Sequence, residues 1–234
     1  MIGDGKESSG MSPRRRTATD APETVDYIVV GAGPSGCAVA ARLAEAPDRP
    51  SVALVETGPA HAPILSNVPL GIAGLVPLRS KYNYAYETTP QAGLGGRRGY
   101  QPRGRGIGGS SLINAMIYTR GQPQDYDAWA ALGCTGWGWT DVLPYFKRSE
   151  NNARGADPWH GVGGPLHVAD LGDPSPVTEA FVEACIQAGF ERNLDFNGER
   201  QEGVGVYQVF QKNGRRYNAG RAYLRAGPET RTCG

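Results

Sequence analysis

The feature that most constrains this chain is a glycine-rich turn between a short strand and a helix. Residues 27–30 (YIVV) are typical of a strand and lead directly into the turn at residues 31–36 (GAGPSG). The Ala- and Leu-rich stretch from Cys37 to Glu45 favours a helix, and residues 51–55 predict a second strand that ends at Glu56. A strand, a crossover helix and a second strand form a βαβ unit with parallel strands. The sequence therefore predicts an α/β fold.

Each glycine of this turn has a role in binding a dinucleotide. Gly31 permits the tight turn, Gly33 lets a pyrophosphate approach the backbone, and Gly36 lets the helix pack closely on the strand. The helix N-terminus supplies free N–H groups and the positive end of a dipole. Glu56 follows the turn by about 20 residues and suits the ribose hydroxyls of adenosine. These residues do not separate NAD from FAD, but the acidic Glu56 argues against the 2′-phosphate of NADP.

A second glycine-dense segment occupies residues 102–116. Its turn, Gly108-Gly109-Ser110-Ser111, precedes an apolar stretch and directs backbone N–H groups and hydroxyls toward an anion or a polar ring edge. Two such turns suit an extended cofactor that is held at its phosphates and at its far end. The alternative is an ordinary glycine-rich loop followed by a capped helix. We expect residues 110–118 to form a short buried helix.

The remaining predicted elements are short and separated by loops. Ser175 is a good N-cap for a helix that has Pro176 at its first position and ends at Gly189. This helix carries an apolar stripe made of Val177, Ala180, Phe181, Ala184, Cys185 and Ala188. We also predict surface helices at residues 125–132 and 140–150, strands at residues 84–88 and 204–210, and a turn at residues 213–214.

Composition and charge argue against several classes of function. The 24 Lys and Arg residues nearly balance the 23 Asp and Glu residues, so no overall charge favours nucleic acid or an anionic membrane. The four cysteines form no Cys-x-x-Cys pair, so neither a zinc site nor a redox dithiol is indicated, and we expect no metal site. No apolar run is long enough to cross a bilayer. Residues 1–24 lack the apolar segment of a signal peptide, and we expect a disordered tail and a cytoplasmic protein.

Several motifs together resemble the glucose–methanol–choline (GMC) oxidoreductase family, and within it the choline dehydrogenase-like branch. The resemblance covers most of residues 25–225. The matching segments include residues 26–33 (DYIVVGAG), 103–116 (RGRGIGGSSLINAM), 118–121 (YTRG), 125–127 (DYD), 143–147 (LPYFK), 159–161 (WHG), 213–216 (NGRR) and 222–224 (AYL).

The resemblance implies two domains. One is an FAD-binding domain of the glutathione-reductase-like Rossmann type, and the other is an α+β substrate domain built on an antiparallel sheet. We expect the first at residues 25–150, with a loop insertion at residues 57–100. Part of the second would occupy residues 151–225, and residues 226–234 read as a divergent tail.

The resemblance also implies where FAD binds. The three glycines of the first turn would serve the pyrophosphate and Glu56 the ribose, while residues 114–116 would approach the isoalloxazine ring. No histidine stands in the second glycine-rich segment, so we expect non-covalent FAD. The predicted cofactor-binding residues are Gly31, Gly33, Pro34, Ser35, Gly36, Glu56, Thr57, Arg103, Ile107, Gly108, Gly109, Ser110, Ser111, Asn114, Ala115, Met116 and Ile117.

The family's catalytic machinery is not evident in this sequence. The resemblance implies a histidine base near the family's C-terminus, and none of His61, His160 and His167 stands in such a motif. We expect His160 and His167 to be structural or surface residues. The chain is therefore interpreted as a truncated or frame-shifted N-terminal fragment of an FAD-dependent enzyme that oxidises the CH–OH group of a small alcohol. We expect it to be unstable and without turnover. A non-catalytic nucleotide-binding remnant is one alternative, and an NAD-dependent Rossmann dehydrogenase is another.

Overall fold

The first unit of the described chain is the βαβ unit that the glycine turn predicts. The computed structural model describes residues 24–224, so the expectations for residues 1–23, for the tail at 225–234 and for Cys233 lie outside it. Strands β1 (Tyr27–Val30) and β2 (Val52–Val55) pair in parallel, with Tyr27 opposite Val52 and Val30 opposite Val55. Helix α1 (Pro34–Ala44) connects them and begins earlier than predicted, because Pro34 suits the first helical position.

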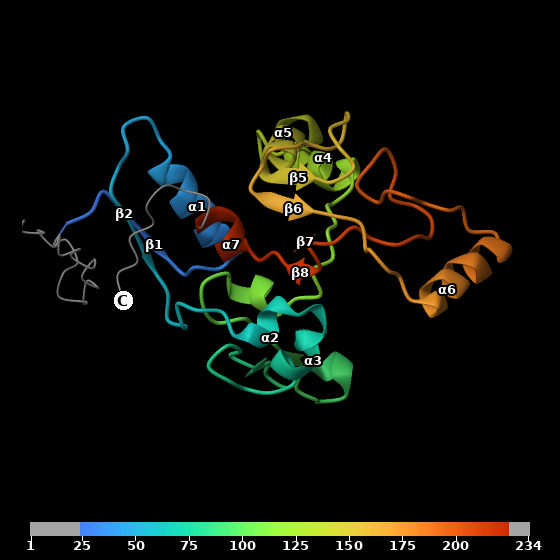
Figure 1. Ribbon diagram of the computed structural model, residues 1–234, viewed down its shortest axis with the longest axis horizontal. Helices are drawn as coiled ribbons and strands as arrows, with labels where there is room; N and C mark the ends of the chain where they lie inside the picture. Colours follow the sequence, from blue (N-terminus) through green and yellow to red (C-terminus); the bar gives the residue numbers. More distant parts are fainter. Residues whose placement is uncertain (1–23, 225–234) are drawn as a thin grey trace, which may run out of the picture.

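The last helix of the described chain packs against the first. Helix α7 (Ala219–Leu224) lies beside α1 although the two come from opposite ends of the sequence (Figure 1). Their contact is a small apolar cluster in which Ala219 meets the buried residues Ala32 and Cys37. Residues 216–224 are thereby brought to the N-terminal βαβ unit.

The other elements are short, and the sheets have two strands each within the described residues. Between the two glycine segments lie α2 (Ile64–Asn67), η2 (Pro69–Gly71), α3 (Ile72–Leu75), η3 (Ala92–Leu94) and the antiparallel pair β3 (Tyr86–Glu87) and β4 (Tyr100–Gln101). After them come η4 (Gly109–Leu112), α4 (Pro123–Ala131), α5 (Trp139–Ser149), the parallel pair β5 (Glu150–Asn152) and β6 (Leu166–Val168), α6 (Pro176–Gln187), and the hairpin of β7 (Gln211–Lys212) and β8 (Arg215–Arg216).

The predicted helices α4, α5 and α6 and the predicted turn are confirmed. Helix α4 has a capping box in which the Asp125 carboxylate accepts from the backbone N–H of Gln122. At the start of α6 the Ser175 hydroxyl accepts from the backbone N–H of Val177, 3.3 Å away. Residues 213 and 214 have φ angles of 53° and 69°, the left-handed pair typical of a tight hairpin.

The expected helix at residues 110–118 is wrong. Only the 3-10 turn η4 forms, although Leu112, Ile113, Met116 and Tyr118 are buried as expected. The chain turns away because the Asn114 side-chain oxygen accepts from the backbone N–H of Met116, whose φ is 63°. Asparagine side chains compete with the helical hydrogen-bond pattern in this way.

The strand predictions outside the βαβ unit hold only in part. The strand at residues 84–88 is reduced to β3, because Ala85 has a φ of 47°. Residues 204–210 form no strand: Val204 pairs singly with Arg192, while Val209 pairs with Ile117 and Ala169. The backbone changes partners within these residues, so no continuous ladder forms.

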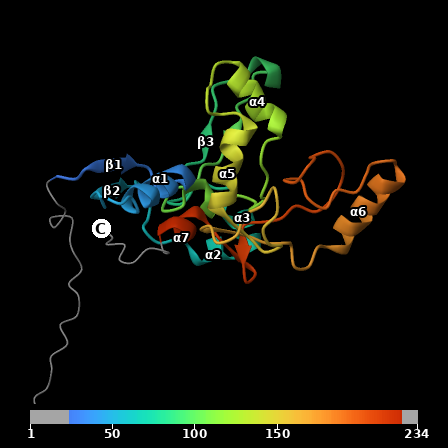
Figure 2. The same ribbon diagram turned by 90° about the horizontal axis from the view of Figure 1, so that it is seen from above.

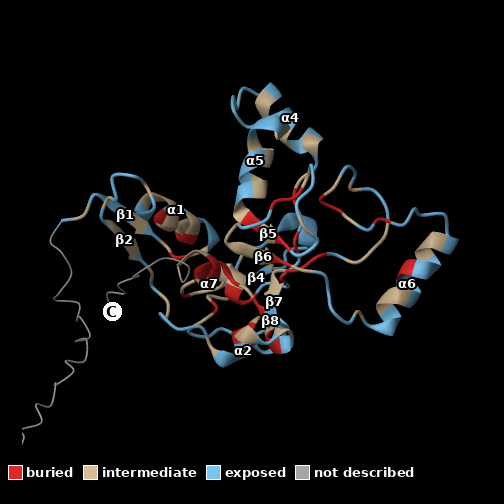
Figure 3. Ribbon diagram, turned by 45° about the horizontal axis from the view of Figure 1, so that its top comes forward, coloured by how far each residue is buried: buried red, intermediate tan, exposed pale blue. Residues whose placement is uncertain are grey.

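The apolar stripe of α6 faces outward. Val177 and Phe181 are 76% and 64% exposed, and Val182 is the buried residue of this helix. Helix α6 projects away from the remaining elements in two perpendicular views (Figures 1 and 2), and its surface is largely exposed (Figure 3). Helical spacing of apolar residues thus predicts the helix correctly but not its packing. No helix of residues 24–224 combines the length and apolar character needed to cross a bilayer.

One face of the β1–β2 sheet is uncovered within the described residues. Ile28 and Val30 are 66% and 82% exposed, and both point to the face opposite α1, because side chains alternate along a strand. Parallel sheets are normally covered on both faces, and an exposed apolar strand favours self-association.

We predict that the double substitution Ile28→Thr/Val30→Thr lowers aggregation of the isolated chain. Threonine keeps the β-branched shape of these side chains but makes this face polar. Static light scattering against concentration would measure the effect, with a several-fold smaller aggregated fraction expected. The matched control is Val29→Thr, which changes the face toward α1 and should not improve solubility. Equal scattering from the double variant and the unmodified chain would refute the prediction.

A buried ionic network joins four distant segments. The Glu150 carboxylate accepts from the Arg120 guanidinium at 2.8 Å and lies 3.1 Å from the His160 ring Nδ1. The other ring nitrogen of His160 lies 2.8 Å from the Asp195 carboxylate. His160 is buried and contacts a carboxylate at both ring nitrogens, so of the two expected places, structural or surface, the surface is excluded. His167 is half-buried, and His61 is exposed.

The network predicts that stability falls at alkaline pH. Burial by itself lowers the pKa of His160, but hydrogen bonds and charges from Asp195 and Glu150 outweigh it and raise the pKa to about 9. A histidine whose pKa rises on folding stabilises the folded state fully at pH values below its unfolded pKa of about 6.5. This stabilisation is lost as the pH rises through about 9. The free energy of unfolding should fall by about 3 kcal/mol over this range. Urea unfolding at pH 6.5 and pH 9.5 measures this difference. An equally steep fall of the free energy of unfolding in the His160→Gln variant would contradict the prediction.

Candidate cofactor site

The two glycine-rich segments lie directly against each other. The backbone N–H of Gly108 donates to the carbonyl of Ala32 at 2.7 Å. A Cβ added to Gly109 would lie 2.6 Å from the Cα of Gly33, so only glycine allows this approach. The structure thus joins the two glycine-rich segments, which the sequence places far apart, into one surface.

The carboxylate of Glu56 connects three backbone segments at this surface. One oxygen accepts from the N–H of Ala32 at 2.8 Å, and the other accepts from Gly58 at 2.8 Å and Gly106 at 3.1 Å. These bonds fix the first glycine turn to the second segment. Binding of a ribose by Glu56 remains a prediction.

The N-terminus of α1 is open on one side and tightly packed on the other. A Cβ on Gly36 would lie 1.9 Å from the carbonyl oxygen of Gly31, whereas a Cβ on Gly33 would meet nothing within 4 Å. Gly33 is the N-cap residue, and no side chain caps this helix. The first N–H groups of a helix have no partner within the helix, so this end can bind an anion.

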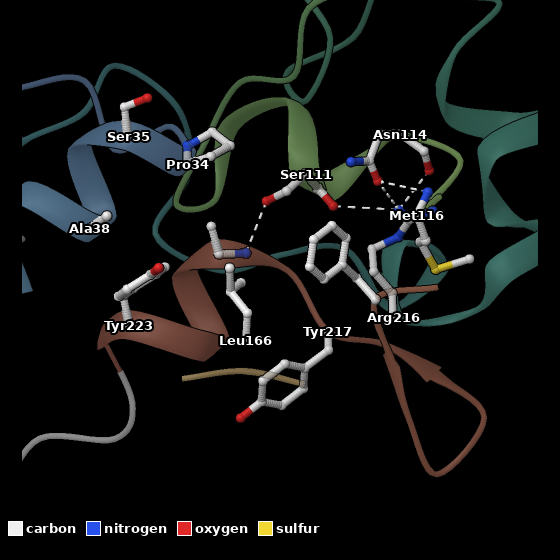
Figure 4. A pocket seen from close by; sticks show the side chains of 12 residues that line it. Pro34, Ser35, Ala38, Ser111, Asn114, Met116, Leu166, Arg216, Tyr217 and Tyr223 are labelled. Carbon is white, nitrogen blue, oxygen red and sulfur yellow. Dashed lines mark hydrogen bonds between the residues drawn. The ribbon is translucent and has the colours of Figure 1, made fainter. Parts of the chain in front are cut away.

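A pocket of about 270 Å³ extends from this helix end toward residue 216 (Figure 4). It is lined by residues from α1, the loop after η4, β6, the residues around β8, and α7. The predicted site residues that line it are Pro34, Ser35, Ser111, Asn114 and Met116, and the residues that the prediction missed include Phe210, Arg216, Tyr217 and Tyr223.

Several other predicted residues have different partners and do not line this pocket. The Ser110 hydroxyl accepts from the N–H of Gly104 at 3.1 Å, and the Thr57 hydroxyl bonds to the hydroxyl of Tyr84. Arg103 is exposed and donates to the carbonyl of the preceding proline at 2.6 Å. Ile107 packs against the cluster around Ala32, and Ala115 and Ile117 are exposed.

The titratable side chains that line the pocket are those of Arg216, Tyr217 and Tyr223. Its lining residues among the described part of the chain include no histidine, aspartate or glutamate. Next to it, burial raises the pKa of the Cys37 thiol to about 11, so this group stays protonated at neutral pH. Burial also raises the pKa of the Tyr223 hydroxyl in the lining, so this group stays protonated at neutral pH as well.

Comparisons with known proteins identify the family of this chain. The family model described as GMC oxidoreductase matches residues 25–230, and the chain belongs to this family.

Similar proteins include an alcohol dehydrogenase [acceptor] of Pseudomonas putida, 46% identical over 200 residues that cover 85% of this chain and 36% of the relative. An oxygen-dependent choline dehydrogenase of Rhizobium johnstonii is 43% identical, with coverages of 86% and 36%. Among solved structures, pyridoxine 4-oxidase of Mesorbium loti matches with a TM-score of 0.81 and 39% identity, over 86% of this chain and 39% of that one. The chain thus spans little more than a third of these relatives.

Proposed function

We propose that this chain is the FAD-binding portion of an oxidoreductase that acts on the CH–OH group of a small alcohol. The observation that carries the proposal is the contact between the two glycine-rich segments beside the uncapped N-terminus of α1. Membership of the GMC family and the similarity to alcohol and choline dehydrogenases support the same assignment.

The residues present fit a non-covalently bound FAD. The open space at Gly33 would admit a diphosphate at the helix end, and the βαβ unit would then have a Rossmann-type role. Glu56 would bind the ribose, and residues 114–116 would lie along the ring. When bound, FAD supplies the hydride acceptor, and this chain's own residues bind and orient it.

Because no histidine or carboxylate lines the pocket among the described residues, we propose that the isolated chain binds the cofactor without oxidising an alcohol. For this chain, the proposal agrees with the alternative of a non-catalytic nucleotide-binding remnant. That alternative does not extend to the family. Turnover of choline or an aryl alcohol by the FAD-loaded chain would overturn this proposal.

Reconstitution tests the cofactor assignment directly. The purified chain is incubated with FAD, desalted, and its absorbance is recorded across the flavin bands before and after denaturation. We expect flavin to remain with the protein and to be released when it unfolds, whereas NAD should not bind. Retention of NAD with no retention of FAD would refute the assignment in favour of a nicotinamide-dependent enzyme.

A further inference from the structure

Arg216 is the largest fully buried side chain of the described chain, with 1% of its surface exposed. Its Nε donates to the backbone carbonyl of Ser66 at 2.8 Å. Its Nη1 donates to the backbone carbonyl of Asn114 at 2.6 Å and to the Asn114 side-chain oxygen at 2.8 Å. The Nη2 group has no hydrogen-bond partner among the described residues.

The charge of Arg216 is not compensated by these contacts. Every partner is a neutral oxygen, and burial lowers the pKa of the guanidinium with no neighbouring charge opposing it. A buried cation without an anion is destabilising. The other fully buried arginine side chain provides the contrast, since Arg120 is paired with the Glu150 carboxylate at 2.8 Å.

The position of Arg216 indicates where its missing partner would come from. Arg216 lines the pocket together with Asn114 and Met116, and the N-terminus of α1 lines the same pocket through Pro34 and Ser35 (Figure 4). A guanidinium group with an unused NH₂ is well suited to an acceptor oxygen that carries negative charge.

We propose that Arg216 uses its Nη2 group to bind an acceptor oxygen of the dinucleotide, and that it positions the loop at residues 111–114 for this contact. The inference rests on the proposed function. The acceptor oxygen belongs either to the diphosphate or to the carbonyl edge of the flavin ring. Both sources offer an acceptor oxygen, and partial ligands separate them: ADP carries the diphosphate without the flavin ring, and riboflavin carries the ring without the diphosphate.

The test compares the unmodified chain with Arg216→Gln and Arg216→Lys in titrations with FAD, ADP and riboflavin. We expect Arg216→Gln to weaken FAD binding at least tenfold, and Arg216→Lys to recover part of the loss because it keeps the charge. A parallel loss for ADP assigns the contact to the diphosphate, and a parallel loss for riboflavin assigns it to the ring. Arg154→Gln, at an exposed arginine paired with Asp170, is the matched control and should bind FAD normally.

The possible failures are distinguishable. If the unmodified chain does not bind FAD, the proposed function fails and this inference fails with it. If the unmodified chain binds FAD and both Arg216 variants bind it equally well, only this inference is overturned. Should the variants not fold, as judged by circular dichroism, the ¹⁵N resonances of the arginine side chains of the unmodified chain decide. A shift of the Arg216 Nη2 resonance on adding FAD is expected, and an unchanged resonance overturns the proposal.

Discussion

Replacing Gly36 by alanine is expected to unfold the N-terminal βαβ unit, whereas replacing Gly33 by alanine should leave it folded and weaken FAD binding. A Cβ at position 36 would lie 1.9 Å from the backbone oxygen of Gly31, and neither backbone can move away without separating α1 from β1. Overpacking of this kind costs about 3 kcal/mol. At Gly33 the added methyl group meets no protein atom within 4 Å, but it occupies the space proposed for the diphosphate.

Urea unfolding and FAD titration of both variants separate the two effects. Gly36→Ala should lower the free energy of unfolding strongly. Gly33→Ala should retain the normal unfolding midpoint and bind FAD at least tenfold more weakly. Normal FAD binding by a folded Gly33→Ala protein would show that this space does not receive the cofactor.

Removing the Glu150 carboxylate should have the second large effect. Glu150→Ala leaves the buried Arg120 guanidinium and the His160 ring without their shared partner, and it removes the acceptor of the Gly161 N–H at 2.6 Å. Breaking a buried pair by removing one member costs about 3–5 kcal/mol, because the other charge remains buried and unpaired. The expected result is a chain that is largely unfolded near neutral pH.

Glu183 provides the matched control for this substitution. Its carboxylate also pairs with an arginine, Arg192, but both side chains are substantially exposed. Exposed pairs contribute about 0–1 kcal/mol, so Glu183→Ala should change stability little. Circular dichroism melting of both variants compares the two sites, and equal losses of stability would contradict a special role for the buried network.

The parts of the structure that the sequence predicts well are those in which one residue type meets a local requirement. The glycine turn of residues 31–36 is one example, because Gly36 must approach the backbone of Gly31. The hairpin at residues 213–214 is another, because Asn and Gly adopt the left-handed conformation that the turn needs. Ser175 at the start of α6 is a third.

The parts that were missed depend on contacts between segments far apart in the sequence. Nothing near Arg216 distinguishes a buried arginine from the exposed Arg215 beside it, since its partners Ser66 and Asn114 lie more than 100 positions away. Likewise, Asn114 reads as an acceptable residue in a short helix until its side chain is seen to bond the N–H of Met116. Local patterns carry little information about such long-range partners.

Hydrogen–deuterium exchange of the unmodified chain, with and without FAD, tests the central claim most directly. The claim is that residues 31–38, 104–116 and 214–219 form one dinucleotide pocket. It predicts that FAD slows amide exchange in all three segments together, while exchange in α6 stays unchanged. Protection confined to residues 31–38, or no protection in any of the three segments, would contradict it.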